Sequence, residues 1–220
     1  MKLFFSIFFA LLVIAKISYS EITNSDYVIK TKGLTIGLVS WTLEIDEKNY
    51  KTKIYLRSKG LLSALYKFEG FYESKGIISN KSYSPKKYIQ KWDTKNKKRD
   101  IYIVFTDKKI ASINIEPKEK ELARIDYKEI NNYVDPIASI LNILDNKNSS
   151  KTIDGRRVYI LEPSLLKNSI KVTIKDYLNI WADHKRNDLE FLEIYESQDS
   201  RLPKKINIGF KGSVFSLAKI

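Results

Sequence analysis

Hydrophobic residues at every second position are the feature of this chain that most restricts its fold. Val39, Trp41, Leu43 and Ile45 alternate with polar residues, which is the pattern of a strand with one buried face. Similar strand-like runs occupy residues 50–58, 66–73, 101–105, 110–115, 158–161, 170–182, 189–196, 205–210 and 214–217. Their close succession indicates a mainly antiparallel β meander rather than alternating β and α units. Because a sheet of this length must curl or close, we expect a curved sheet or a half-open barrel.

One segment departs from this pattern and predicts an amphipathic helix over residues 136–145. Asp135 can accept hydrogen bonds from the free N–H groups of a first helical turn, and Pro136 has the fixed φ that suits the first helical position. Four apolar residues follow with helical spacing: Ile137, Ile140, Leu141 and Leu144. Such a helix would lie on the sheet or in the mouth of a barrel, where it would either pack in the core or gate a ligand.

Residues 21–220 are expected to form one β-rich domain. Their number suits one large β domain or two small ones, and no linker, internal repeat or low-complexity tract divides them. A chain of this length can bury a sizeable core, which matters because it contains no cysteine and therefore no disulfide. The missing cysteine also excludes thiolate metal sites, thiol catalysis and a lipid-modified N-terminal cysteine.

The first twenty residues predict export. Lys2 precedes an apolar run over residues 3–15, which has the length of a signal-peptide hydrophobic region and is short for a bilayer span. Ser18 and Ser20 are small residues at the two positions before the cleavage site that a signal peptidase recognises. We therefore expect residues 1–20 to be a signal peptide cleaved after Ser20, and the mature protein to lie in the periplasm without a transmembrane segment. The alternatives are a retained membrane anchor and a buried core helix.

The net charge of +13 does not by itself indicate a nucleic-acid partner. Only seven of the 39 basic residues are arginines, and the lysines are spread along the whole chain. Abundant Lys, Ile and Asn are what codon bias in an AT-rich genome would produce. The densest basic stretch, residues 95–99, lies between two strand-like runs and is interpreted as a solvated turn. We expect no binding to nucleic acid.

Few residues suit catalysis or metal binding. His184 is the only histidine, and no Gly-x-Ser-x-Gly motif or glycine-rich phosphate loop occurs. One histidine without cysteine argues against zinc. We therefore expect no metal site, no cofactor and no catalytic residue. Should the protein be an enzyme, Asp183, His184 and Asp188 would be the first residues to test, because they place the imidazole near two carboxylates.

Aromatic residues are abundant, with fourteen Tyr, ten Phe and three Trp. In an antiparallel sheet they would fill the core or line an apolar cavity, as in small barrels that hold a ligand. The candidate ligand-lining residues are six aromatic residues of the strand-like segments and four residues of the predicted helix: Tyr55, Tyr66, Phe71, Tyr72, Trp92 and Tyr102, and Ile137, Ile140, Leu141 and Leu144.

A set of polar and turn residues in the second half of the chain carries a family resemblance. It consists of Asp135 and Pro136 before the helix, then Asp154, Gly155, Arg156 and Arg157, and finally Arg201 and Pro203. Their order resembles the DUF3108 family, exported proteins of Gram-negative bacteria with no established activity. The resemblance implies a location and a fold but no reaction. The nearest architectural analogy is the unclosed barrel of periplasmic lipoprotein carriers of the LolA/LolB kind.

These motif residues also have simple structural interpretations. Asp154-Gly155 is typical of a turn, the two arginines can form ion pairs with nearby carboxylates, and Pro203 can begin an edge strand.

Three functions remain open. The leading hypothesis is a non-catalytic envelope protein that binds a lipid or another apolar or amphipathic ligand on a concave β surface. The second is a scaffold that pairs with an envelope protein through an exposed sheet edge, because an open meander would leave its first and last strands unpaired. The third is a hydrolase of unknown substrate. A cavity under the helix would favour the first hypothesis, and a filled interior the second.

Overall fold

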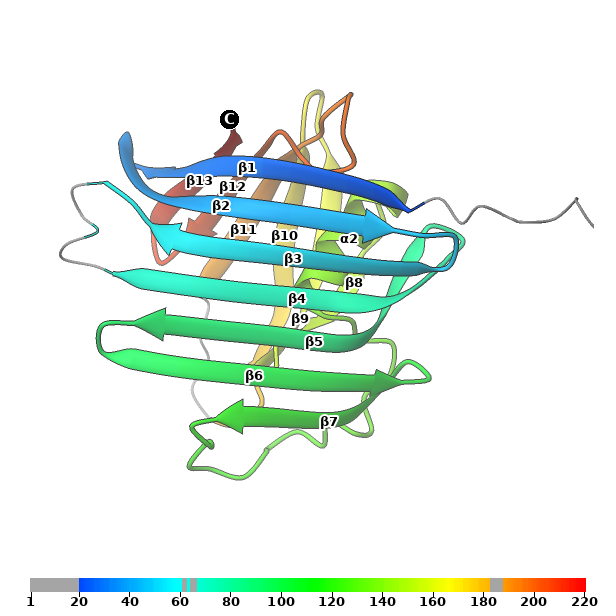
Figure 1. Cartoon of the computed structure of the whole chain (residues 1–220). Coiled ribbons are helices and arrows are strands. Elements are labelled where there is room, and N and C mark those ends of the chain that lie inside the picture. Colours follow the sequence, from blue (N-terminus) through cyan, green and yellow to red (C-terminus); the bar gives the residue numbers. More distant parts are fainter. Residues whose placement is uncertain (1–19, 61–62, 64–66, 183–187) are drawn as a thin grey trace, which may run out of the picture.

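The computed structural model describes residues 20–60, 63, 67–182 and 188–220, and thirteen strands in this part of the chain form one antiparallel sheet (Figure 1). The prediction of a mainly antiparallel β fold is confirmed. The strands are β1 (Glu21–Thr31), β2 (Leu34–Ile45), β3 (Asn49–Ser58), β4 (Phe68–Ser79), β5 (Ser82–Thr94), β6 (Lys97–Thr106), β7 (Lys109–Glu116), β8 (Ser150–Ile153), β9 (Arg157–Leu165), β10 (Ile170–Asn179), β11 (Leu189–Tyr195), β12 (Lys205–Phe210) and β13 (Ser213–Lys219). A single helix of the described chain, α2 (Pro136–Asn146), separates β7 from β8.

The first and last strands pair with each other in the middle of the sheet. The spatial order is β7-β6-β5-β4-β3-β2-β1-β13-β12-β11-β10-β9-β8. Tyr27 of β1 lies opposite Lys219 of β13, and Thr31 lies opposite Phe215. The expectation of unpaired first and last strands was therefore wrong: the edge strands are β7 and β8, because the chain leaves one edge after β7 and returns at the other with β8.

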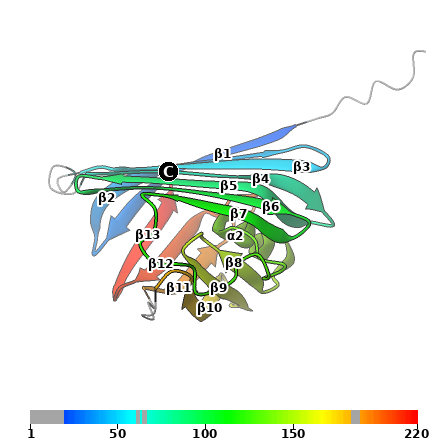
Figure 2. The same cartoon turned by 90° about the horizontal axis from the view of Figure 1, so that it is seen from below.

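The sheet bends so that its two ends face each other. Figure 2 shows β1 to β7 as one layer, with β8 to β13 curling beneath it and α2 between the two layers. The curvature follows from length, since thirteen twisted strands cannot remain a flat open sheet. The predicted curved, barrel-like sheet is confirmed.

Two short contacts span the gap between the edge strands. At the end of the barrel that contains α2, Asn131 forms an isolated bridge with Lys109 of β7, and Val134 forms one with Thr152 of β8. Further along the gap, the turn between β8 and β9 lies against side chains of β6 and β7. There a Cβ atom on Gly155 would lie 2.5 Å from Cγ2 of Ile101 in β6, and Gly155 has a φ of +87°. Glycine therefore permits both the turn and the close approach.

Helix α2 packs its apolar face into the core. Ile137, Leu141, Ile143 and Leu144 are buried, and so are the small residues Ala138 and Ser139. The helix contacts β5 in one layer and β8 in the other. It begins where the cap and proline predict and ends at Asn146, one residue beyond the predicted end, because Lys147 adopts a left-handed conformation and closes the last turn.

Three strands carried no period-two signal strong enough to be predicted, namely β1, β5 and β8. In β1 the inward-facing position 25 is a serine, and in β5 Pro85 lies at a register shift opposite Gly76. Strand β8 has only four residues. The basic stretch at residues 95–99 forms the β5–β6 hairpin together with the start of β6.

Candidate ligand-binding site

A cavity of about 770 Å³ occupies the end of the barrel that lies away from α2. Its apolar wall combines residues of both layers: Ile29, Ile36, Leu56, Phe68, Tyr72, Trp92, Ile101, Ile208, Phe210, Phe215 and Leu217. Most of these side chains are half-buried rather than buried, because they face space instead of a packed neighbour. A cavity with these walls suits an apolar ligand.

Two aromatic residues of the cavity wall stack on each other. Phe68 of β4 stacks on Trp92 of β5 with ring centroids 5.8 Å apart and planes inclined by 7°. Gly70 lies beside this pair in the sheet, where a Cβ atom would come within 3.0 Å of the Trp92 ring. The glycine therefore leaves room for the indole at the cavity wall.

Charged side chains surround one side of the same cavity. Five are cationic and two are anionic: Lys97, Arg99, Arg156, Arg157 and Lys211, and Asp154 and Asp188. They come from the start of β6, from the β8–β9 turn and the start of β9, from the β12–β13 turn and from the residue before β11, so the cavity has apolar walls and a charged mouth.

Glu119 joins two of these cations across the gap between the edge strands. Its Oε1 accepts a hydrogen bond from Nε of Arg156 at 2.7 Å and also pairs with Arg99. Burial alone would raise the pKa of Glu119, but the two guanidinium groups outweigh it and hold the pKa below its usual value. Burial, and then the nearby charge of Arg99, lower the pKa of Arg156.

Asp154 and Arg157 form the other part of the mouth. Oδ1 of Asp154 accepts hydrogen bonds from the backbone N–H groups of Arg156 at 2.8 Å and Arg157 at 2.7 Å, which fixes the turn before β9. Oδ2 pairs with the Arg157 guanidinium at 3.3 Å. The structural interpretation of this motif is correct, and three of its four residues also line the cavity.

The other end of the barrel contains a buried polar chain. Oδ1 of Asp135 accepts hydrogen bonds from the N–H groups of Ile137 at 2.9 Å and Ala138 at 3.0 Å, as an N-cap does. Oδ2 accepts a hydrogen bond of 2.6 Å from Ser74, whose Oγ lies 2.9 Å from the hydroxyl of Tyr50. Burial raises the pKa of Asp135 to about 6, although the hydrogen bonds from Ser74 and the backbone oppose the shift.

The structure separates the predicted lining residues into two groups. Tyr72 and Trp92 line the cavity, whereas the other predicted residues that the structure describes are absent from its wall: Tyr55, Phe71 and Tyr102 of the sheet, and Ile137, Ile140, Leu141 and Leu144 of α2. Tyr66 lies outside the described residues. Ile137, Leu141 and Leu144 are buried in the core, and Ile140 is partly buried against it. The interior is therefore filled beneath the helix and open at the opposite end.

The remaining motif residues are Pro136, at the start of α2, and Pro203 and Arg201, which connect the segment before β12 with β1. Pro136 occupies the first turn of α2, where its missing N–H is not needed. The Tyr27 hydroxyl donates a 2.8 Å hydrogen bond to the carbonyl oxygen of Pro203. Nε of Arg201 lies 3.0 Å from Glu21 in an exposed ion pair. These contacts are structural, and neither Arg201 nor Pro203 lines the cavity.

Of the three residues named for possible catalysis, the structure describes only one. Asp183 and His184 lie outside the described residues. Asp188 lies at the cavity mouth, with its Oδ2 4.0 Å from Nζ of Lys211. Within the described part of the chain, no three metal-ligating side chains form a cluster, and no helix is long and apolar enough to cross a membrane.

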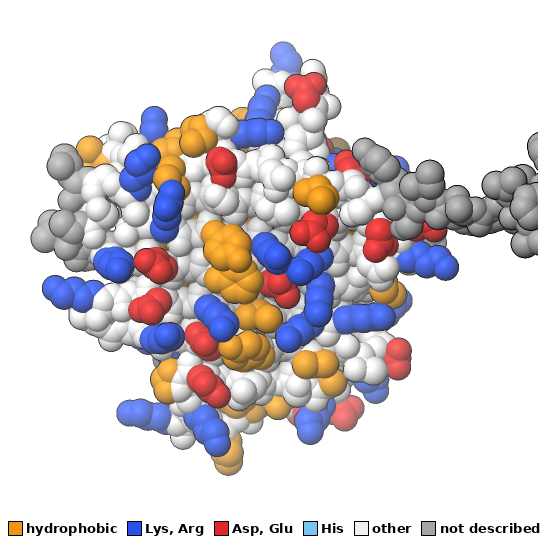
Figure 3. Space-filling model, in the orientation of Figure 1, with side chains coloured by type: hydrophobic (Ala, Val, Ile, Leu, Met, Phe, Trp, Pro, Cys, Tyr) orange, Lys and Arg blue, Asp and Glu red, His pale blue; other side chains and the backbone are white. Residues whose placement is uncertain are grey.

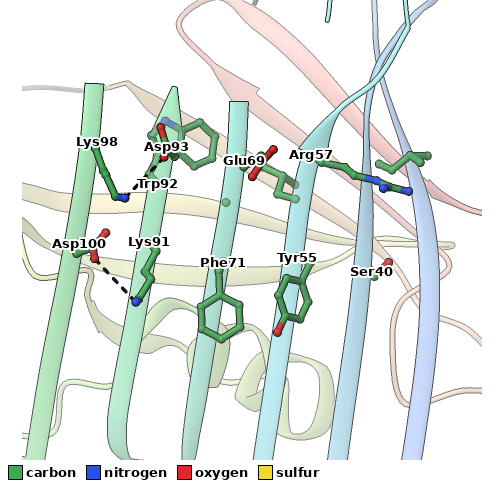
Figure 4. Close-up of a pocket in the computed structure, with 13 residues that line it drawn as sticks. Ser40, Tyr55, Arg57, Glu69, Phe71, Lys91, Trp92, Asp93, Lys98 and Asp100 are labelled. Atoms are coloured by element: carbon green, nitrogen blue, oxygen red, sulfur yellow. Dashed lines mark ion pairs between the residues drawn. The ribbon is translucent and has the colours of Figure 1, made fainter. Parts of the chain in front are cut away.

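A second hollow lies on the outer face of the β1–β7 layer. Figure 3 shows hydrophobic side chains gathered on this face among Lys, Arg, Asp and Glu side chains. In Figure 4, Tyr55 and Phe71 lie side by side, and the Lys91–Asp100 and Lys98–Asp93 ion pairs, at 3.9 Å and 3.8 Å, both lie on the side of Phe71 that is away from Tyr55. The aromatic ring centroids are 4.9 Å apart, and 54% of Tyr55 is exposed. This hollow has its floor on one layer, whereas the cavity has walls from two.

Most of the cavity wall was not predicted from the sequence. The alternation places Phe68 and Tyr72 on one face of their strand, but it does not distinguish an inward residue that meets a neighbour from one that faces a cavity. Glu119 was part of a charged segment without a recognisable pattern. Arg99 and Lys97 were interpreted as part of a solvated turn, and both line the mouth.

Comparison with known proteins gives a family and no activity. A family model described as a protein of unknown function (DUF3108) matches residues 26–184, which excludes Arg201 and Pro203. No curated protein matches the sequence. The similar solved structures include the following two. The β-barrel-like DUF1849 protein from Brucella abortus is 8% identical, with 90% of this chain and 95% of that chain covered and a TM-score of 0.48. A DUF1329 family protein from Desulfovibrio piger is 9% identical, and the alignment covers 93% of this chain and 85% of that chain with a TM-score of 0.21.

The two structural similarities are too weak to support an argument about function. The family match is of a different kind, because it covers well over half of the sequence and includes the helix cap at Asp135 and the Asp154–Arg157 turn. It confirms the resemblance seen in these residues, and the chain therefore belongs to the DUF3108 family.

Proposed function

We propose that this protein is a non-catalytic envelope protein, exported to the periplasm, that holds a lipid or another molecule with an acyl chain in the cavity between its two layers. The single observation that carries the proposal is the cavity of about 770 Å³ with apolar walls from eight strands. This volume falls within the range of about 300–1,000 Å³ that is usual for small-molecule sites.

The contrast within the barrel supports this proposal. A barrel of this size can bury its inward side chains completely, as it does around α2. At the other end, aromatic and aliphatic side chains remain half-buried around an open volume. Leaving them in contact with water forgoes about 25 cal/mol for each Å² of apolar surface, which an apolar ligand would recover on binding.

Periplasmic location rests on the N-terminal sequence. Residues 1–19 lie outside the described residues, so the signal peptide stays a prediction. The mass of the mature N-terminus tests it: a chain that begins at Glu21 would support export, whereas a membrane-bound chain that retains Met1 would contradict it.

Binding is tested first by native mass spectrometry of the protein purified from its host, which should show a co-purified lipid. A binding assay with an uncharged apolar ligand, 1-dodecanol, then locates the site. We expect Leu217→Trp, which fills the cavity from β13, to weaken binding at least about tenfold, equivalent to about 1.4 kcal/mol.

Val214→Trp is the matched control, because Val214 lies on the same strand, is exposed and is not part of the cavity wall. It should leave binding unchanged. Binding that persists in Leu217→Trp but disappears in Tyr55→Ala would move the site to the outer hollow and contradict the proposal. A protein that never contains or binds an apolar ligand would also contradict it.

A further inference from the structure

The mouth of the cavity has an excess of positive charge at the boundary of an apolar space. Five cationic side chains face two carboxylates in the lining, and Glu119 adds a third between Arg99 and Arg156. Two positive charges therefore remain uncompensated by these groups. Lys97 and Lys211 are exposed to water, so the partly buried arginines are the cations that a further counter-charge would stabilise.

Arginine, rather than lysine, dominates this mouth. Only seven of the 39 basic residues in the chain are arginines, and three of them line the cavity: Arg99, Arg156 and Arg157. A guanidinium presents several N–H donors in a fixed plane, which matches the geometry of a carboxylate or phosphate group better than an ammonium does.

Two of these arginines keep an unused donor. Nε of Arg99 and Nε of Arg157 are buried and have no hydrogen-bond partner among the described residues. Each guanidinium uses a terminal nitrogen for a carboxylate, Glu119 for Arg99 and Asp154 for Arg157. A buried donor without a partner is a free-energy cost that an additional acceptor would remove.

We infer that the cavity takes an amphipathic ligand with an anionic head group, a carboxylate or a phosphate, which Arg99 and Arg157 bind at the mouth while the acyl chain lies among the apolar side chains. The inference rests on the proposed function and adds the charge and the orientation of the ligand. It orders the ligand along the barrel: the chain end points toward the packed core and the head group toward the β8–β9 turn.

Calorimetric titration of the mature protein with four ligands of equal chain length tests this inference. The ligands are dodecanoate, dodecyl phosphate, 1-dodecanol and dodecylammonium, each below its micellar concentration and at a pH where the acids are ionised. We expect the two anions to bind at least about tenfold more tightly than the alcohol, and the ammonium to bind most weakly. High salt should reduce the preference for anions.

Variants locate the head-group site. Arg99→Gln and Arg157→Gln should each remove most of the preference for anions, and they should weaken the binding of 1-dodecanol much less than that of dodecanoate. Arg57→Gln is the matched control, because Arg57 is exposed on the outer face. A melting curve for each variant excludes loss of fold, and the comparison of ligands on the unmodified protein does not depend on the variants.

The outcomes separate this inference from the proposed function. Equal binding of dodecanoate and 1-dodecanol would overturn the inference and leave the proposed function intact. If no member of the series binds, both are wrong. Inorganic phosphate that binds alone as tightly as dodecyl phosphate would also overturn the inference, because the mouth would then be a site for the free ion.

Discussion

The two ends of this barrel belong to one sheet and have opposite interiors. Around α2, large side chains fill the space and their polar atoms are satisfied. Examples are Tyr50, whose hydroxyl lies 2.9 Å from Ser74, and Trp41, whose Nε1 donates to Thr52 at 2.8 Å. At the opposite end, side chains of similar type surround a cavity of about 770 Å³. The difference is the helix, which fills one end only.

Electrostatics differ between the two ends as well. Asp135 at the packed end is a buried acid with no cation among its hydrogen-bond partners, and its pKa is raised. Glu119 at the open end lies between two arginines, and its pKa is lowered. The packed end therefore favours a neutral carboxyl group, and the open end favours a charged one. One curved sheet thus contains a packed core at one end and a cavity with a charged mouth at the other.

The largest expected effect comes from a cavity made at the packed end. Leu141→Ala should lower the free energy of unfolding by about 4 kcal/mol, because Leu141 is buried between the layers and its removal leaves a void. Leu56→Ala at the open end should lower it by about 1 kcal/mol, because Leu56 already borders empty space. Urea unfolding of both variants gives the comparison.

Ile22→Ala is the control for these two variants, since Ile22 is 60% exposed, and it should change stability by less than about 0.5 kcal/mol. Equal losses for Leu141→Ala and Leu56→Ala would show that the two ends are packed alike, and the contrast drawn here would fail.

A smaller effect is expected from the buried acid. The folded-state pKa of Asp135, about 6, lies above its ordinary value of 3.8. The folded state therefore binds the proton more tightly, so this group stabilises the protein below about pH 4, and its contribution is lost as the pH rises through 6. The whole effect is at most about 3 kcal/mol.

Asp135→Asn tests this sign, because asparagine can still accept the two backbone hydrogen bonds of the cap. The free energy of unfolding of the variant, measured relative to that of the unmodified protein, should increase as the pH rises from 4 to 7. Parallel stability curves for the two proteins over this range would rule out a raised pKa at Asp135.

Glu119 should respond to acid in the opposite direction. Its folded-state pKa is lowered, so its contribution is present above its ordinary pKa and is lost as the pH falls through the folded value. Glu119→Gln should cost roughly 2 kcal/mol at neutral pH, because two partly buried guanidinium groups lose their shared carboxylate.

Glu69→Gln provides the reference for an exposed ion pair, since Glu69 and Lys67 are 3.9 Å apart and largely exposed, and its effect should stay below about 0.5 kcal/mol. A Glu119→Gln variant as stable as Glu69→Gln would mean that the open end does not depend on this ion pair.

The sequence contains enough information to predict the strands and the helix but not the division of the interior. Alternation identifies which residues of β2, β3 and β12 face inward, and the cap at Asp135 marks the start of α2. These are local signals, set by the period of the backbone and by the free N–H groups of a first turn.

The position of the cavity depends on distant pairings that no local pattern encodes. The helix fills one end because Asn131 and Val134 tie the segment before it to β7 and β8. At the mouth, Glu119 reaches Arg99 and Arg156 from a loop, so the ion pairs there join segments that are distant in the sequence. The four apolar helix residues satisfied the pattern of a ligand gate as well as that of a core helix. Only the placement of α2 between the layers separates these two roles.

The pairing of β1 with β13 has a consequence for the time course of folding. Positions 27 and 219 lie opposite each other, so β1 gains its second neighbour only after the chain has been made almost to residue 219. Until then one side of β1 carries unpaired N–H and C=O groups beside buried-face residues such as Tyr27 and Ile29. Such an edge can pair with another chain, so the newly made protein has an interval in which a chaperone that covers extended strands would protect it.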